Sequence, residues 1–332
     1  MLLTAVAGAT MKAARAASPP MRLGGPIFVK SDDPDVQAKA HRDLGYRAAY
    51  VPSSLATKDT DRIAATAKAF AAHDVVIAEV GAWKNMLDPD LEKRRANIAY
   101  VADRLALAEV LGARNCVDIA GSFNPTVWFG QDPKNLSKAF FDATVENCRK
   151  VIDAVNPKRA RFTIEMMPWS LPSTPDEYLT LIEAVDRKPF GVHLDVCNTM
   201  SSPVRLYNNA AVIDECFRKL GPWIVSCHAK DLQWGPGYQV NIQEVIPGTG
   251  VIDYKAYLRN LSQLPTEAPL MLEHLHNEAE YTQGREYPKR QVAVEERETA
   301  RRFGGTGFSD VATASSILWR PVRPRPAPSR IA

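Results

Sequence analysis

The 332-residue sequence lacks two features that would indicate a membrane or secreted protein. None of its apolar runs approaches the ~20 residues that a membrane-spanning helix requires, so we expect no membrane association. Its five cysteines are scattered, odd in number and without a Cys-x-x-Cys pair. This usage favours reduced thiols over a disulfide framework. The sequence therefore predicts a cytoplasmic protein.

A strong charge of either sign is also absent. The net charge is +3, from 41 basic and 38 acidic residues, which is too small to indicate a nucleic-acid partner or a membrane surface. The hydrophobic share of 45% and the charged share of 24% are ordinary for a globular protein. Residues 1–20 are Ala-rich, and their positive charges follow the apolar segment, the reverse of a secretory signal. We interpret them as an N-terminal extension.

Residues 21–303 alternate between short apolar segments and segments with helical periodicity. The expected strands lie within residues 22–28, 48–52, 75–81, 115–121, 162–168, 191–198, 224–231 and 269–275. Strands that alternate with helices pair in parallel, and eight such units close a (β/α)8 TIM barrel. A doubly wound sheet is the competing architecture, but it would not bring the last four strands around one point. We predict an α/β fold with one barrel domain over residues 21–303.

Each of the last four expected strands carries a polar residue near its C-terminal end. These residues are Glu165, Asp195, His228 and Glu273. Because the C-terminal strand ends form the active face of such a barrel, the four side chains should converge. Three carboxylates and one imidazole suit a divalent cation such as Mn²⁺, Mg²⁺, Co²⁺ or Zn²⁺. For any one glutamate alone, the alternative is a buried salt bridge.

Two further polar residues share a strand face with a predicted ligand. His193 lies two residues before Asp195, so both side chains point to the same side of a buried strand. His193 could contact a substrate hydroxyl, orient Asp195 or remain a core histidine. Lys230 lies two residues after His228 and could reach a substrate oxygen or extend to the barrel rim.

Three tryptophans stand near the expected starts of loops: Trp83, Trp169 and Trp234. Indole rings at such positions can stack on a sugar ring, or they can pack beneath the loops. We include all three among the candidate substrate contacts.

Five segments carry a family resemblance. They are Ile164-Glu-Met-Met-Pro168, Val192-His-Leu-Asp195, Cys227-His-Ala-Lys-Asp231, Ile246-Pro-Gly-Thr-Gly-Val-Ile-Asp253 and Leu272-Glu-His274. In this order and spacing they resemble the sugar phosphate isomerase/epimerase family, whose members are xylose isomerase-like barrels. The resemblance covers roughly residues 22–281. It implies that Glu165, Asp195, His228 and Glu273 hold one divalent ion, foremost Mn²⁺, and that the substrate is a small carbohydrate.

The resemblance also implies a chemistry. A sugar isomerase or epimerase acting on a keto-sugar or inosose would remove a proton beside the carbonyl through a metal-stabilised enediolate, with Glu165 and Glu273 as catalytic carboxylates. The alternative is a lyase of the C-glycoside deglycosidase type, which would use the same site for β-elimination from 3-oxo-glycosides together with a small partner subunit. A non-catalytic sugar-binding barrel is a third hypothesis. We expect a homo-oligomer as a further assembly and no nucleic-acid partner.

The sequence departs from two related groups. Free-ketose 3-epimerases have a histidine three residues after the metal-binding aspartate, where this chain has Asn198, and an arginine after the metal-binding histidine, near Trp234 here. We therefore do not expect a plain tagatose- or psicose-type epimerase, and we include Asn198 among the candidate substrate contacts. Endonuclease IV-type barrels need several histidines in the N-terminal half, which here offers only His41 and His73.

The last 29 residues lead to the first prediction. Residues 304–332 are rich in Gly, Ser, Pro and Arg, which indicates a disordered basic tail. Truncation after residue 303 should leave the melting temperature nearly unchanged, because such a tail adds little to a barrel core. Thermal unfolding of the full-length and shortened proteins tests this, and a drop of many degrees would show that the segment docks on the barrel.

Overall fold

The barrel is closed by eight parallel strands in the computed structural model, which describes residues 21–303, with side chains to residue 291. Their order around the barrel is β1-β10-β7-β6-β5-β4-β3-β2. The strands are β1 (Leu23–Gly24), β2 (Ala48–Tyr50), β3 (Val76–Gly81), β4 (Asn115–Ile119), β5 (Arg161–Glu165), β6 (Phe190–Asp195), β7 (Ile224–Ala229) and β10 (Leu270–Leu272). The predicted (β/α)8 barrel is confirmed. The predicted extension and tail lie outside the described residues.

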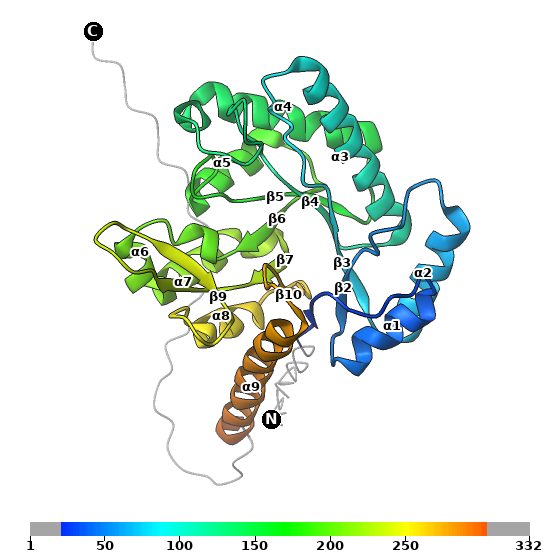
Figure 1. The fold of residues 1–332 in the computed structure, drawn as a ribbon, viewed down its shortest axis with the longest axis vertical. Helices are drawn as coiled ribbons and strands as arrows, with labels where there is room; N and C mark the ends of the chain where they lie inside the picture. Colours follow the sequence, from blue (N-terminus) through cyan, green and yellow to red (C-terminus); the bar gives the residue numbers. More distant parts are fainter. Residues whose placement is uncertain (1–20, 304–332) are drawn as a thin grey trace, which may run out of the picture. The chain divides into compact units, whose positions relative to one another are not determined.

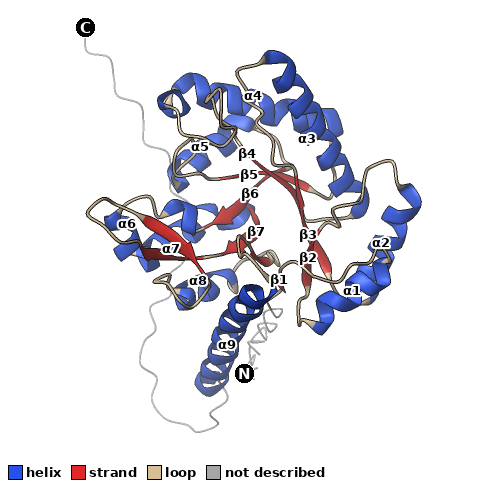
Figure 2. Cartoon of the chain, viewed as in Figure 1, coloured by secondary structure: helices blue, strands red, loops and turns tan. Residues whose placement is uncertain are grey.

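Helices surround the strands on the outside of the barrel (Figure 1, Figure 2). They are α1 (Pro34–Asp43), α2 (Thr60–Ala72), α3 (Leu91–Leu111), α4 (Lys138–Val155), α5 (Pro175–Val185), α6 (Pro203–Tyr207), α7 (Asn209–Leu220), α8 (Tyr254–Leu261) and α9 (Glu278–Phe303). Short 3-10 turns cover Pro133–Leu136, Cys197–Thr199 and Gly221–Trp223. None of the helices within residues 21–303 combines the length and apolar character needed to cross a bilayer.

Local sequence explains where helix α5 begins, after the strand that carries Glu165. The Thr174 hydroxyl accepts a hydrogen bond from the Glu177 N–H, and the Glu177 carboxylate accepts one from the Thr174 N–H. This reciprocal pair is a capping box, with Pro175 at the first helical position. The capping box therefore fixes the start of the helix at Pro175.

No hairpin is predicted from the sequence between the strands expected within residues 224–231 and 269–275, but the structure has an antiparallel one there. Strand β8 (Asp231–Trp234) pairs with β9 (Ile242–Val245). The Asp231 carboxylate accepts hydrogen bonds from the backbone N–H groups of Gly248, Gly250 and Ile252. The Gly-Thr-Gly stretch is thus held by Asp231 as a structural loop beside the hairpin.

Two strand pairs shift register inside the barrel. Ala49 pairs with Ile77, but Tyr50 pairs with Glu79, so β3 contributes one extra residue, Ala78. In the same way, Val192 pairs with Ile224 and His193 pairs with Ser226. An extra residue re-aims the side chains that follow it. On the other side of β3, Glu79 pairs with Asn115 of β4, and both side chains are buried.

Tyr178 ties the barrel strands β5 and β6 together. Its buried hydroxyl lies 2.7 Å from the Ile164 carbonyl and 2.9 Å from the Gly191 carbonyl, and it accepts from the Ile164 N–H at 3.1 Å. These residues belong to the strands that end in Glu165 and Asp195.

We predict that Tyr178→Phe lowers the free energy of unfolding by about 1–3 kcal/mol, because it leaves buried backbone groups without their hydroxyl partner. Urea denaturation measures this change. Tyr207→Phe is the control, because Tyr207 is 73% exposed and its hydroxyl can bond to water. Equal stabilities for the two variants would contradict the proposed role of Tyr178.

Candidate metal centre and substrate pocket

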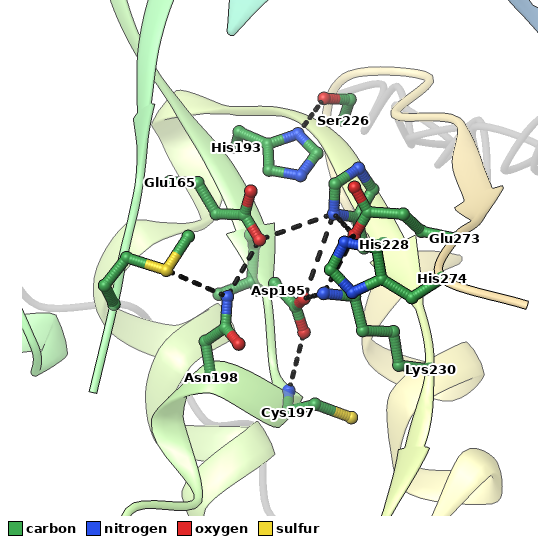
Figure 3. Close-up of polar contacts among 12 residues, drawn as sticks. Glu165, His193, Asp195, Cys197, Asn198, Ser226, His228, Lys230, Glu273 and His274 are labelled. Carbon is green, nitrogen blue, oxygen red and sulfur yellow. Dashed lines mark hydrogen bonds and ion pairs between the residues drawn. The ribbon is translucent and has the colours of Figure 1, made fainter. Parts of the chain in front are cut away.

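The four predicted ligands converge at the C-terminal ends of their strands. Donor atoms of Glu165, Asp195, His228 and Glu273 all lie within 4.8 Å of one another, and Figure 3 shows the side chains directed toward one another. The Nδ1 atom of His228 lies 3.4 Å from Glu165, 3.8 Å from Asp195 and 2.9 Å from Glu273. Strands β5, β6 and β7 carry the first three residues, and Glu273 directly follows β10.

The donor atoms fit a divalent cation. Asp195 Oδ2, His228 Nδ1 and Glu273 Oε2 are buried and lack a hydrogen bond of good geometry to any described residue; their close contacts are ion pairs with one another and with Lys230. Buried polar atoms whose hydrogen-bonding capacity is not met cost free energy, and here they face a common point. Carboxylate oxygens and one imidazole nitrogen form a ligand set for Mn²⁺, Mg²⁺, Co²⁺ or Zn²⁺.

Lys230 supplies positive charge beside this cluster. Its Nζ atom lies 2.8 Å from Asp195 Oδ2, 2.8 Å from Glu273 Oε2 and 3.4 Å from Glu244 Oε1. Burial opposes its charge, but the carboxylates led by Asp195 outweigh burial and hold the pKa of Lys230 well above its usual range. One ammonium group beside several carboxylates leaves the cluster negative, which favours a bound cation.

A cavity of about 560 Å³ opens beside the cluster. One part of its wall is polar, and the remainder is mostly apolar and aromatic. The polar part includes Glu165, Asn198, Lys230 and Glu273, and the aromatic part consists of Trp83, Trp128, Phe129 and Trp169. This division suits a ligand with polar groups directed at the cluster and apolar faces against the rings.

Comparison with protein families matches residues 38–291 to the family described as xylose isomerase-like TIM barrel. The chain belongs to this family. A search of curated proteins found no match.

Solved structures share the fold of this xylose isomerase-like barrel at low sequence identity. A xylose isomerase-like barrel from Mycobacterium smegmatis in complex with magnesium is 20% identical, covers 78% of this chain and 88% of its own, and has a TM-score of 0.58. Endonuclease IV from Thermus thermophilus is 16% identical, with 83% and 100% covered and a TM-score of 0.62. The apo 3-keto-D-glucoside 4-epimerase from E. coli is 14% identical, with 82% and 99% covered and a TM-score of 0.58.

Most of the other predicted substrate contacts lie at the cavity of this xylose isomerase-like barrel. Lys230, Trp83 and Trp169 line it. Asn198 also lines it, and its side-chain amide donates a hydrogen bond to Glu165 Oε1 at 2.8 Å. Asn198 therefore orients a predicted ligand as well as facing the cavity.

Two predicted contacts are placed elsewhere. Trp234 does not line this cavity, because it lies on the hairpin with its ring 5.4 Å from that of Tyr207. His193 is fully buried beneath the cluster, with Nδ1 at 2.6 Å from the Ser226 hydroxyl. The structure thus places the Trp234 ring at the hairpin and the His193 ring beneath the cluster, which are two of the alternatives that the sequence left open. His41 and His73 also lie apart from the cluster. His41 is within hydrogen-bond distance of the Gln37 carbonyl, and His73 of the Asp35 carboxylate.

Sequence reasoning missed several residues near the site. Glu79 lies on β3 within 3.3 Å of both His193 and His228. Its signal was a carboxylate inside an apolar strand, the same signal that identified Glu165. Glu244 lies within hydrogen-bond distance of His274, the residue after Glu273, which has a left-handed φ of 59°. The contact was missed because Glu244 belongs to the hairpin that was not predicted from the sequence.

The acidic residues of the cluster differ in their protonation. Burial raises the pKa of Glu165 to about 7. Burial acts in the same direction on Asp195 and Glu273. Lys230 overrides it for Asp195 and His228 overrides it for Glu273, so the pKa of each stays well below its usual range. In the absence of a cation, Glu165 is therefore the carboxyl group of these three most easily protonated near neutral pH.

We predict that Mn²⁺ raises the melting temperature of protein dialysed against EDTA. A ligand that binds only the folded state at a hundred times its Kd stabilises it by about 2.7 kcal/mol. His228→Ala removes the nitrogen ligand and should lose most of this gain, whereas His73→Ala, at the end of α2, should keep it. Thermal unfolding with and without Mn²⁺ measures the difference. Full stabilisation of His228→Ala would place the ion elsewhere.

Proposed function

We propose that the protein is a divalent-metal-dependent isomerase or epimerase of a keto-sugar or inosose, which moves a proton at the carbon beside a carbonyl. The observation that carries this proposal is the placement of Glu165 and Glu273. Both carboxylates belong to the candidate metal centre beside the cavity, yet strands β7 and β6 separate β10 from β5. The two groups therefore approach a bound substrate from different directions.

The chain's own residues would carry out the proton transfer. When bound, a divalent cation supplies electrostatic stabilisation of the negative charge that develops on the substrate carbonyl oxygen. One carboxylate accepts the proton from the neighbouring carbon, and the other side returns a proton to the same carbon or the next. The substrate isomerises without gain or loss of electrons. The Asn198 amide orients Glu165 during these steps.

The charge of the cavity favours an uncharged sugar over a sugar phosphate. Glu165, Glu244 and Glu273 line it, and the ammonium group of Lys230 is already paired with carboxylates. A phosphate group would therefore enter a region rich in negative charge without a free cationic side chain among its described lining residues. A neutral carbonyl sugar avoids this repulsion.

The comparison with the E. coli 3-keto-D-glucoside 4-epimerase supports a keto-sugar as substrate. The endonuclease IV likeness concerns the fold, because this chain brings neither His41 nor His73 to its predicted metal centre.

A lyase is the second candidate, favoured by the aromatic part of the cavity. Trp128 and Phe129 line it while remaining 39% and 54% exposed, which leaves apolar surface for a group beyond one sugar ring. Removal of the same proton would then be followed by cleavage of the bond to a β-substituent. The substituent leaves with the bonding electron pair and takes up a proton. A product analysis separates the two reactions, because an epimerase retains every carbon of its substrate in one molecule.

We predict that Glu273→Gln lowers solvent-hydrogen exchange at the substrate's α-carbon by about 10²–10⁴-fold, the usual contribution of a positioned general base. Glutamine keeps a coordinating oxygen, so metal content should fall only modestly. Glu165→Gln should act similarly on the opposite epimer. The measurement is deuterium incorporation from D₂O into a panel of keto-sugars, followed by NMR, with metal content determined in parallel.

The control is Glu146→Gln, on the exposed side of α4, which should retain wild-type exchange. Wild-type exchange by metal-loaded Glu273→Gln would rule out Glu273 as the base and direct attention to Lys230. Absence of exchange by the wild-type protein with any keto-sugar of the panel would count against the proposed reaction.

A further inference from the structure

Beneath the metal centre, the barrel interior contains a chain of buried polar side chains. TIM-barrel interiors are usually filled by branched apolar residues. Here Glu79, His193, Ser226, Asn115 and Thr163 are each fully buried. The Asn115 amide donates to Thr163 and Ser226 at 3.0 Å, and Ser226 lies 2.6 Å from His193 Nδ1; Figure 3 shows the last contact.

Glu79 connects this chain to the metal centre. Its Oε1 atom lies 3.3 Å from His193 Nδ1, and its Oε2 atom lies 3.3 Å from His228 Nε2. The two histidine rings are close, with centroids 4.0 Å apart. Only the Oε2 contact with His228 meets the criteria for a hydrogen bond, because Oε1 has no hydrogen bond of good geometry among the described residues and His193 Nδ1 lies closer to the Ser226 hydroxyl.

The two nitrogens of His228 face different surroundings. Nδ1 faces the carboxylates of Glu165, Asp195 and Glu273, whereas Nε2 faces Glu79. A neutral imidazole has one N–H donor and one nitrogen with a free lone pair, and only the latter can coordinate a cation. A proton on Nε2 that points at Glu79 leaves the lone pair of Nδ1 directed at the centre.

We propose that Glu79 is a positioning residue for the metal centre: it accepts a hydrogen bond from His228 Nε2–H and so holds the ring with Nδ1 toward the cation. The inference rests on the proposed metal centre but not on the reaction catalysed there. Removal of a carboxylate that orients a metal-binding histidine typically lowers metal affinity by about 10–100-fold.

The register shift of β3 explains how the carboxylate reaches this position. Because Ala78 is an extra residue relative to β2, Glu79 takes its place as the partner of Tyr50; on the other side of β3, Glu79 pairs with Asn115. Asn115 itself belongs to the buried polar chain. The shift therefore directs Glu79 to the interior, where its partners are His193 and His228.

Two substitutions separate orientation from simple charge. Glu79→Gln keeps the length of the side chain and an oxygen acceptor for His228 Nε2–H but removes the negative charge. Glu79→Asp keeps the charge but shortens the reach by one methylene. If Glu79 positions His228, Asp should weaken Co²⁺ binding by about 10–100-fold and Gln should weaken it less. If Glu79 contributes only charge, Gln should be the weaker binder.

Asp118→Asn is the matched control. Asp118 lies on the neighbouring strand β4 and is also fully buried, but its carboxylate accepts from the backbone N–H groups of Lys84 and Ile119. Its substitution should leave Co²⁺ affinity within about twofold of wild type, the expectation for a carboxylate with no contact to a ligand. Thermal unfolding of each variant confirms that it is folded.

The experiment combines titration calorimetry with Co²⁺ and ¹⁵N NMR of the Zn²⁺-loaded protein. We expect one Co²⁺ per chain, a His228 ring with a proton on Nε2 and the metal on Nδ1, and weaker binding by Glu79→Asp than by Glu79→Gln. Tighter binding by Asp than by Gln, coordination through Nε2, or wild-type affinity in both variants would overturn the inference. Two Co²⁺ ions per chain would also overturn it, because Glu79 would then be a ligand of a second ion.

The outcome is distinguishable from failure of the proposed function. A wild-type protein that binds Co²⁺ through His228 Nδ1 but promotes no deuterium exchange would retain the positioning role and lose the proposed reaction. A wild-type protein that binds no Co²⁺ would overturn the positioning role, because it would have no metal centre to orient.

Discussion

The electrostatics of buried carboxylates constrain the C-terminal half of the barrel. Asp195 is fully buried, Glu165 is 3% exposed and the side chain of Glu273 is 17% exposed. Like charges at this separation cannot all remain ionised in a poorly solvated site without compensation. Lys230 provides part of that compensation. The convergence of three carboxylates and one imidazole is thus expected at a binding site. In a purely structural core the same cluster would have an unfavourable electrostatic free energy.

The interior of the barrel contains two layers of polar side chains, one at the C-terminal ends of the strands and one beneath it. The upper layer holds the predicted ligands, and the layer beneath holds Glu79, His193 and their hydrogen-bonded neighbours. Around both, Tyr178 and the backbone ladders hold β5 and β6 in place. The ligand geometry is therefore set by the barrel strands, while the aromatic part of the cavity is formed by loops and can vary without disturbing the ligands.

Sequence reasoning recovered the parts of the site that depend on local periodicity. Glu165, Asp195 and His228 each interrupt an apolar strand close to its end, so alternation along a strand and the geometry of a closed barrel predict their convergence. The hairpin β8–β9 was missed because its pairing joins segments on either side of a Gly-Pro-Gly turn. Glu79 was missed for a different reason: simple alternation cannot indicate where a strand gains an extra residue.

The extra residue on β3 also bears on how related barrels should be compared. A strand has a side-chain period of two, so removing one residue reverses the face of every side chain beyond it. Deletion of Ala78 would leave the glutamate in the sequence but turn its side chain away from the two histidines. In an alignment of relatives, a one-residue gap at this strand would therefore mark a barrel of different interior chemistry, even where the adjacent letters agree.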